Sequence, residues 1–511
     1  MDRTASLVLR ATALAASALV TPLAYAQGLA PSLVTDTAGD TIWSCTDLDQ
    51  NGDYNGAGEV APFYSDTLGP VPLTNNAAIL LSEDGALWIT DTSEDIVLRL
   101  FDLDGNGNAE GPGEAVVWFD GTEGNASGVE LTSGRGQWRD EDGVHWVASA
   151  NTGGGGVDAI VRLEDVNGDG DANDAGEQLE YAVFAVGGSV GDSIPTAVAR
   201  GADGALYYVE TGSTGVFAKG VYRLEDLDGS GTIDQPNENT AFFLPSSLGG
   251  SPFHWDLGVD EDGRFYMNDT GNDVIWRFSD VNGDGTVDEA TEADVVYDAP
   301  ATSLIWEITP ASDGSLYVVE DQNPDRLLRL VDLNGDGLFD GPGEEITIYD
   351  ETVSPTNFGS PKGIVLLENL PIGTNECGPA VANSSGGPAT ASAIGSTSLA
   401  AQSVTLSATG LPTNSFSYFL TSTTPAFIAN PGGSQGNLCL SGAVGRYAGN
   451  ILNSGASGEV SLAIDVTSLP QPTGSVAAVV GETWRFQAWF RDANPNVTSN
   501  FSDAIAITFT P

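Results

Sequence analysis

Six stretches of the chain place oxygen-bearing side chains at the spacing of a calcium-binding loop. The clearest, 332–344, has Asp or Asn at positions 1, 3, 5 and 9 and Gly337 at position 6. A hard cation takes about six to eight oxygen ligands at short range, and the chain must reverse sharply at position 6 to gather them around one point. Six copies with acidic side chains at fixed offsets favour calcium loops over a set of metal-free Asp/Gly turns.

The predicted ligands are the side chains at positions 1, 3, 5, 9 and 13 of each loop. They are Asp47, Asp49, Asn51, Asn55 and Glu59; Asp102, Asp104, Asn106, Glu110 and Glu114; Asp165, Asn167, Asp169, Asn173 and Glu177; Asp226, Asp228, Ser230, Asp234 and Glu238; Asp280, Asn282, Asp284, Asp288 and Glu292; and Asp332, Asn334, Asp336, Asp340 and Glu344. An EF-hand loop has its bidentate glutamate at position 12 and lies between two helices. Here the glutamate stands at position 13 and short apolar runs flank each loop, so each loop is predicted to join two β-strands.

The spacing of the loops predicts a β-propeller. Successive loops start 52 to 63 residues apart, which is the period of a propeller blade. The beginning of the repeat region lacks a first strand, and 362–367 supplies a lone first strand at its end, so the two ends are predicted to complete one blade and close the circle. The sequence therefore predicts an all-β protein with a six-bladed β-propeller at residues 27–368, carrying about one calcium ion per blade.

The two ends of the chain differ from the repeat region. Residues 1–26 have two early arginines, an apolar run and Ala24-Tyr25-Ala26, which predicts a secretory signal peptide and an exported protein in the periplasm, on the cell surface or outside the cell. Residues 369–385 are interpreted as a linker and the start of a C-terminal module. Residues 386–511 alternate short apolar and polar segments between turn residues, which predicts a β-sandwich domain.

Charge and cysteines limit the partners and the disulfides. The formal net charge of −54 repels nucleic acid and anionic membranes, and no segment after the signal peptide is apolar enough to span a bilayer. Three cysteines allow one disulfide. We predict that Cys377 pairs with Cys439, because both lie in the C-terminal region, and that Cys45 is a small buried side chain in a strand.

Few side chains outside the loops suit catalysis. Aligning the repeats places Trp255 beside Trp306 and Asp256 beside Glu307, near the start of two first strands and close to His254. Two acids and a histidine suit acid–base chemistry or a metal, so the predicted catalytic residues are His254, Asp256 and Glu307. Two indole rings suit a sugar, and the predicted ligand-binding residues are Trp255, Trp306, Lys362 and Arg139. The alternative, in which the tryptophans are core packing and the acids pair with arginines, remains open. His145 is interpreted as structural.

The segment 262–277 resembles a blade of the NHL and SMP-30-like (TolB-like) six-bladed propellers. The loops are similar to the DxDxDG calcium loops of integrin-type propellers. SMP-30-like lactonases hold a divalent metal in the channel through a glutamate near the start of an inner strand, together with an asparagine and an aspartate. The resemblance implies such a metal at Glu307, which matches the glutamate, whereas the other two ligands have no assigned match in this chain. The segments 433–440 and 484–492 resemble a module appended to exported planctomycete and proteobacterial proteins.

Two functions follow from these residues. The first is an exported calcium-binding propeller that binds a glycan, a protein or another cell-surface component through its channel face, with the C-terminal module serving attachment or binding. The alternative is a metal-dependent hydrolase, lactonase or lyase with an additional divalent metal and its site in the central channel.

Overall fold

The computed structural model describes residues 29–510 apart from short gaps at 83, 104–105, 123, 126–127, 141, 151–157, 185–192, 213–216, 235–236, 301–302, 369–370, 398, 400–403 and 494–495. The predicted signal peptide and the predicted ligand Asp104 lie outside the described residues. Within them the chain is built of β-strands, with one short 3-10 turn, η1 (Pro431–Gly433). The all-β prediction is confirmed.

Residues 29–368 form six four-stranded antiparallel sheets. Five follow the chain order: β4 (Asn76–Leu81), β5 (Leu87–Asp91), β6 (Ile96–Leu100) and β7 (Ala115–Asp120); β8 (Gly134–Arg139), β9 (His145–Ser149), β10 (Ala159–Leu163) and β11 (Gln178–Val183); β12 (Pro195–Arg200), β13 (Leu206–Glu210), β14 (Gly220–Leu224) and β15 (Asn239–Phe243); β16 (His254–Val259), β17 (Phe265–Asp269), β18 (Val274–Phe278) and β19 (Ala293–Asp298); and β20 (Ile305–Pro310), β21 (Leu316–Glu320), β22 (Arg326–Leu330) and β23 (Glu345–Asp350). In the sixth sheet, β24 (Pro361–Leu366) pairs with β1 (Ser32–Asp36), which is followed by β2 (Thr41–Cys45) and β3 (Val60–Ser65). The two ends of this region thus share one sheet, as the lone first strand predicts.

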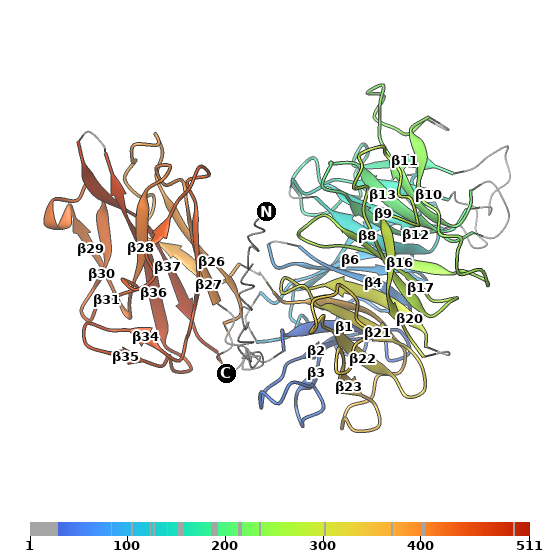
Figure 1. The fold of residues 1–511 in the computed structure, drawn as a ribbon, viewed down its shortest axis with the longest axis horizontal. Coiled ribbons are helices and arrows are strands. Elements are labelled where there is room, and N and C mark those ends of the chain that lie inside the picture. The colour runs from blue at the N-terminus through green and yellow to red at the C-terminus, as the bar shows by residue number, and fades with distance from the viewer. Residues whose placement is uncertain are drawn as a thin grey trace, which may run out of the picture.

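The six sheets follow one another in a closed cycle. Figure 1 shows them together in the body at the right. The first strands β4, β8, β12, β16, β20 and β24 contact one another in that order, and β24 contacts β4. Six hydrophobic clusters each join two neighbouring sheets. One of them packs Val34 and Ile364 of the sixth sheet against Val319 and Leu327 of the fifth, which closes the cycle. We call residues 29–368 the ring.

A buried acid at the end of most second strands holds the start of the first strand in place. Asp269, at the end of β17, accepts hydrogen bonds from the N–H groups of Phe253 and Gly271 at 2.9 and 3.1 Å. Asp91, at the end of β5, accepts the N–H groups of Thr74 and Asn75 at 2.7 and 3.0 Å. A carboxylate satisfies several turn N–H groups at once, so these acids fix where each first strand begins.

The described residues from 371 onward form a second group of sheets. A six-stranded sheet runs β25 (Thr374–Glu376), β37 (Thr498–Thr508), β36 (Thr483–Asp492), β28 (Phe416–Ser422) and β31 (Gly445–Arg446), with β32 (Leu452–Asn453) also on β28, and a three-stranded sheet runs β26 (Thr390–Gly395), β27 (Val404–Thr409) and β33 (Val460–Ile464). Two small hairpins are β29 (Thr424–Ala429) with β30 (Asn437–Ser441) and β34 (Leu469–Pro470) with β35 (Ser475–Val476). One large cluster, with Leu406, Trp484 and Phe486, joins the two larger sheets.

The predicted cysteine pattern is confirmed. Cys377 and Cys439 form a disulfide with an S–S distance of 2.09 Å. Cys45 is free and fully buried, and burial raises the pKa of its thiol to about 12. It therefore packs as an apolar side chain within β2.

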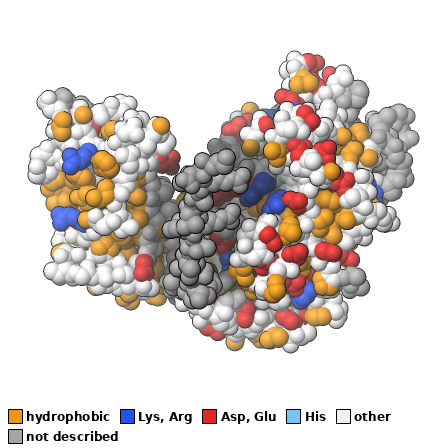
Figure 2. All heavy atoms as spheres, viewed as in Figure 1, with side chains coloured by type: hydrophobic (Ala, Val, Ile, Leu, Met, Phe, Trp, Pro, Cys, Tyr) orange, Lys and Arg blue, Asp and Glu red, His pale blue; other side chains and the backbone are white. Residues whose placement is uncertain are grey.

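The two groups of sheets differ in their surfaces. Acidic side chains are spread over the ring, whereas few are visible on the body formed by the C-terminal sheets (Figure 2). Among the described residues, no helix has the length and apolar character needed to cross a membrane.

Candidate functional site

All six loops fold around their position-1 aspartate. In the last loop, one carboxylate oxygen of Asp332 accepts the N–H of Gly337 at 2.8 Å. The same bond to the position-6 glycine occurs in the other five loops at 2.8 to 3.0 Å. Gly337 has φ +84°, a left-handed conformation that glycine adopts without steric cost, which is why position 6 is glycine throughout.

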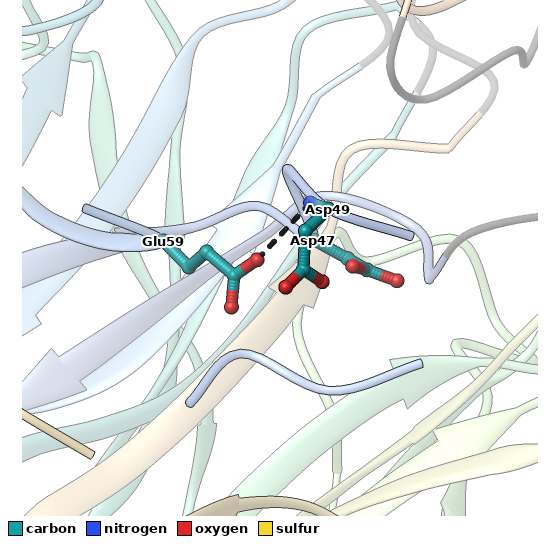
Figure 3. A group of neighbouring side chains, drawn as sticks. All are labelled: Asp47, Asp49 and Glu59. Carbon is teal, nitrogen blue, oxygen red and sulfur yellow. Dashed lines mark hydrogen bonds between the residues drawn. The ribbon is translucent and has the colours of Figure 1, made fainter. Parts of the chain in front are cut away.

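In two loops the structure brings three predicted ligands together. Carboxylate oxygens of Asp47, Asp49 and Glu59 all lie within 4.8 Å of one another (Figure 3), and so do those of Asp226, Asp228 and Glu238. Positions 1 and 13 are the more enclosed members of each group, while position 3 faces solvent in both. Three negative charges this close repel one another, and a divalent cation between them would remove that repulsion.

The position-13 glutamates also close the loops, a role that sequence reasoning missed. One oxygen of Glu344 accepts the N–H groups of Leu333 and Asn334 at 3.0 and 3.1 Å, and the other accepts that of Gly341 at 2.7 Å. Glu59 makes the matching bonds, and Figure 3 draws its bond from the N–H of Asp49. Because each carboxylate oxygen has a second lone pair, these bonds leave ligand capacity, and the ligand role of position 13 stays a prediction.

Position 9 reaches the neighbouring sheet in three loops. The side-chain oxygens of Asn55 and Asn173 accept the N–H groups of Asp350 and Asp120 at 2.9 and 2.8 Å. Glu110 accepts the Ser65 hydroxyl at 3.3 Å. These three side chains therefore bind outer strands of adjacent sheets, in addition to whatever part they take in a metal site.

Position 8 fastens every loop to the sheet before it. Its N–H donates to a carbonyl of the fourth strand of that sheet at 2.7 to 2.9 Å, and its side chain is buried in the cluster between the two sheets. The six donor and acceptor pairs are Tyr54 with Ile348, Ala109 with Phe63, Ala172 with Trp118, Ile233 with Tyr181, Val287 with Phe242, and Phe339 with Val296. Each loop thus connects its own sheet to the preceding sheet, at all six junctions of the ring.

A second candidate site lies where the first strands begin. Trp255 and Trp306 meet edge to face with ring centres 4.7 Å apart, as the aligned repeats predict. The Lys362 ammonium lies 3.8 Å from the Trp306 ring and pairs with Asp321. Arg135, which sequence reasoning missed, lies 4.8 Å from the Trp255 ring. Arg135 is the second residue of the first strand of its sheet. Trp255, Trp306 and Lys362 hold the same position in their own sheets, so the alignment of the repeats could have identified Arg135.

Asp256 and Glu307 form a buried acid pair beside these rings. Asp256 accepts the N–H of Ile308 at 3.0 Å, and Glu307 accepts that of Ile364 at 3.2 Å. Burial raises the pKa of Asp256 to about 6. Burial, and then the charge of Asp256, raise the pKa of Glu307 well above its usual value. Among the described residues neither acid is ion-paired with an arginine, so burial and mutual repulsion both favour the protonated form of the pair.

The other two predicted members have different neighbours. His254 is fully buried, which lowers its pKa to about 4, and the charged groups that act on it are Asp269 and Lys219 rather than the acid pair. Arg139 is the last residue of β8 and Arg135 the second, about 13 Å apart at the rise of a strand. Arg139 lies over Trp88 and Trp118 instead.

His145 has a structural role, as the sequence indicates. It is fully buried, its Nε2 lies 2.8 Å from Oε1 of Gln137, and its ring contacts those of Trp88 and Trp118.

No protein-family model matches the chain, and a search of curated proteins finds no match. Among solved structures, a streptogramin B lyase is 16% identical over 66% of this chain and 85% of its own, with a TM-score of 0.40. A calcium-binding regucalcin from Agrobacterium tumefaciens is 15% identical over 54% and 78%, with a TM-score of 0.35. A gluconolactonase from Xanthomonas campestris is 15% identical over 57% and 84%, with a TM-score of 0.36. At these identities and TM-scores the likenesses are too distant to assign an activity.

Proposed function

We propose that the ring is a six-bladed β-propeller whose six loops bind calcium, in an exported protein that binds a glycan or another cell-surface component through its channel. Residues 386–511 are proposed to form a β-sandwich that serves attachment or binding. The repetition of one loop geometry carries this proposal. In each loop the position-1 aspartate is hydrogen-bonded to the position-6 glycine, and position 8 is fastened to the preceding sheet.

Calcium in these loops would stabilise the contacts between sheets. A cation bound by positions 1, 3 and 5 holds the loop closed, and position 8 of the same loop carries the bond to the next sheet. Ion binding by the folded ring alone adds stability by mass action. The disulfide between Cys377 and Cys439 supports export, because such bonds persist in oxidising compartments.

The channel mouth at Trp255 and Trp306 suits a sugar. The two indole rings offer apolar surface, and the adjacent Arg135 and Lys362 offer cationic donors. Sugars bind through such combinations of an aromatic face and charged hydrogen-bond donors.

One observation favours the second candidate, a hydrolase, lactonase or lyase acting in the channel. Burial raises the pKa of Glu307 well above its usual value, and it lies beside Asp256, whose pKa is about 6. Two neighbouring carboxyl groups with raised pKa values suit the roles of acid and base. An additional divalent metal at Glu307 would have to displace its proton, so metal binding there would rise with pH.

Metal analysis after dialysis against a weak chelator separates the two functions. Calcium alone supports the binding protein, whereas an additional transition metal supports the enzyme. Glu307→Gln and Asp256→Asn then test the channel. An acid–base or metal role predicts a loss of turnover of about a hundredfold or more, and Asp262→Asn, at an exposed turn, is the matched control. If both channel variants keep full function, the site lies elsewhere.

A further inference from the structure

A cavity of 1130 Å³ opens at the end of the ring opposite the Trp255 and Trp306 mouth. The cavity lies at the ends of three neighbouring first strands. Its lining includes Leu81 of β4, Trp138 and Arg139 of β8, and Arg200 of β12. Two acids from the turns after β4 and β8, Asp84 and Asp142, also line it. Pockets for small ligands typically enclose about 300 to 1,000 Å³, so this cavity is large enough for a ligand of several rings.

Two cations, Arg139 and Arg200, line this cavity. Among the described residues, Arg139 has no ionic partner. Its guanidinium lies 4.3 Å from the Trp88 ring and 5.4 Å from the Trp118 ring. Its Nη1 is buried and has no hydrogen-bond partner. Burial lowers its pKa, although not enough for a guanidinium to lose its charge. Stacking on the two rings therefore fixes a charged, planar guanidinium at the cavity wall. Because Nη1 is buried, the donors that can face a ligand are the N–H groups of Nε and Nη2.

The other cation of the cavity is already neutralised. Arg200 donates from Nε to Asp140 at 2.5 Å and from Nη2 to the second oxygen of the same carboxylate. Asp140 also accepts the indole N–H groups of Trp138 and Trp146 at 3.0 and 2.8 Å. These bonds hold the half-buried Trp138 ring in one orientation beside Arg139.

We propose that this cavity binds an acidic sugar, with the sugar carboxylate on Arg139 and a sugar ring against Trp138. The guanidinium presents paired N–H donors that match a carboxylate. Asp84 and Asp142 accept hydrogen bonds from sugar hydroxyls, which a bare anion lacks. A phosphate dianion would bring two negative charges and only one O–H donor to these two acids, so the wall favours a singly charged ligand rich in hydroxyls.

This site lies beyond the proposed channel function, since it uses none of the loop ligands and none of the residues at the other mouth. Arg264 provides the control. It lies in the turn that follows β16, pairs with Asp260 and Asp262, and lines neither this cavity nor the mouth at Trp255 and Trp306.

The test is calorimetric titration of the full chain, in saturating calcium, with a tetrasaccharide of alternating glucuronate and N-acetylglucosamine. Its carboxyl-reduced form, acetate and inorganic phosphate are titrated beside it. Wild type and Arg264→Gln should bind the acidic tetrasaccharide alike, and Arg139→Gln should bind it at least about tenfold more weakly. Arg139→Lys should fall between them, because it keeps the charge and loses the paired donors. Unchanged thermal unfolding shows that each variant is folded.

Four results would overturn the proposal. These are no binding by wild type, equal binding of the carboxyl-reduced form, binding of acetate or phosphate as tight as that of the tetrasaccharide, and binding by Arg139→Gln as tight as that by Arg264→Gln. None of them bears on calcium binding by the loops, which is measured separately.

Discussion

The ring distributes its apolar contacts over six clusters, each shared by two neighbouring sheets, whereas one large cluster joins the C-terminal sheets. The ring adds a hydrogen-bonded acidic loop at each junction, and the C-terminal sheets add a disulfide. Of the 71 acidic residues only six lie in 370–511. From this comparison we expect the stability of the ring to depend on cations that offset the negative charge of its loops. We expect the stability of the C-terminal sheets to depend on the disulfide and on their shared hydrophobic cluster.

Removing calcium should have the largest effect and should fall on the ring alone. We expect EDTA to lower the melting temperature of the ring by tens of degrees, because each ion bound only by the folded loops adds stability by mass action. The C-terminal transition should stay where it is. Differential scanning calorimetry with and without EDTA measures both. An unchanged ring transition after confirmed metal loss would contradict the proposed role of the loops.

Phe339→Ala should weaken one junction of the ring. Phe339 is 4% exposed and fills the cluster between the fourth and fifth sheets in chain order, so the variant leaves a cavity costing about 3 to 5 kcal/mol. Leu333 stands in the same loop at 51% exposure, and Leu333→Ala should change stability by less than about 0.5 kcal/mol. Denaturant unfolding of both variants gives the comparison. Equal losses would mean that position 8 has no special part in the junction.

Removing the disulfide should affect only the C-terminal sheets. The bond closes a loop of 62 residues, and the chain-entropy model assigns about 4 kcal/mol to a closure of this length. We expect Cys377→Ser with Cys439→Ser to lower the C-terminal transition and to leave the ring transition unchanged in saturating calcium. A shift of the ring transition instead would show that the two regions unfold as one unit.

The buried acid pair should make ring stability depend on pH. Asp256 has a folded pKa of about 6, above its ordinary value, so the folded ring holds more protons than the unfolded chain between about pH 4 and 6. Its contribution to stability is therefore present below pH 4 and is lost as pH rises to 6. The free energy of unfolding of wild type should therefore fall between about pH 4 and 6, and Asp256→Asn should make this decrease smaller by about 1 to 3 kcal/mol. Urea unfolding at several pH values in this interval measures it. Asp262→Asn should leave it unchanged.

The repeat pattern predicted much of the fold because each loop has a fixed glycine and fixed acids. The pairing of β24 with β1 followed from the missing first strand, and the contact of Trp255 with Trp306 followed from aligned repeats. The disulfide followed from the composition of the C-terminal region. In each case a repeat or a change of composition in the sequence predicts which segments lie together in the structure.

Side-chain direction within a strand was harder to predict. His254 and Asp256 are close in sequence, but the register of β16 shifts between His254 and Leu257, so spacing alone does not say which face each side chain takes. Arg139 was placed at the Trp255 mouth, although it stands at the other end of its strand. The hydrogen bond from position 8 to the preceding sheet was not predicted, because a backbone N–H group makes it and no polar side chain marks the position in the sequence.

The number of calcium ions bound per chain tests the central claim most directly. Equilibrium dialysis with isotopic calcium should give six for wild type and five for a variant with Asp332→Asn and Asp336→Asn, which removes two carboxylates from one loop. Arg139→Gln, which touches no loop ligand, should still bind six. A wild type that binds no calcium, or a loop variant that binds as many ions as wild type, would contradict the account.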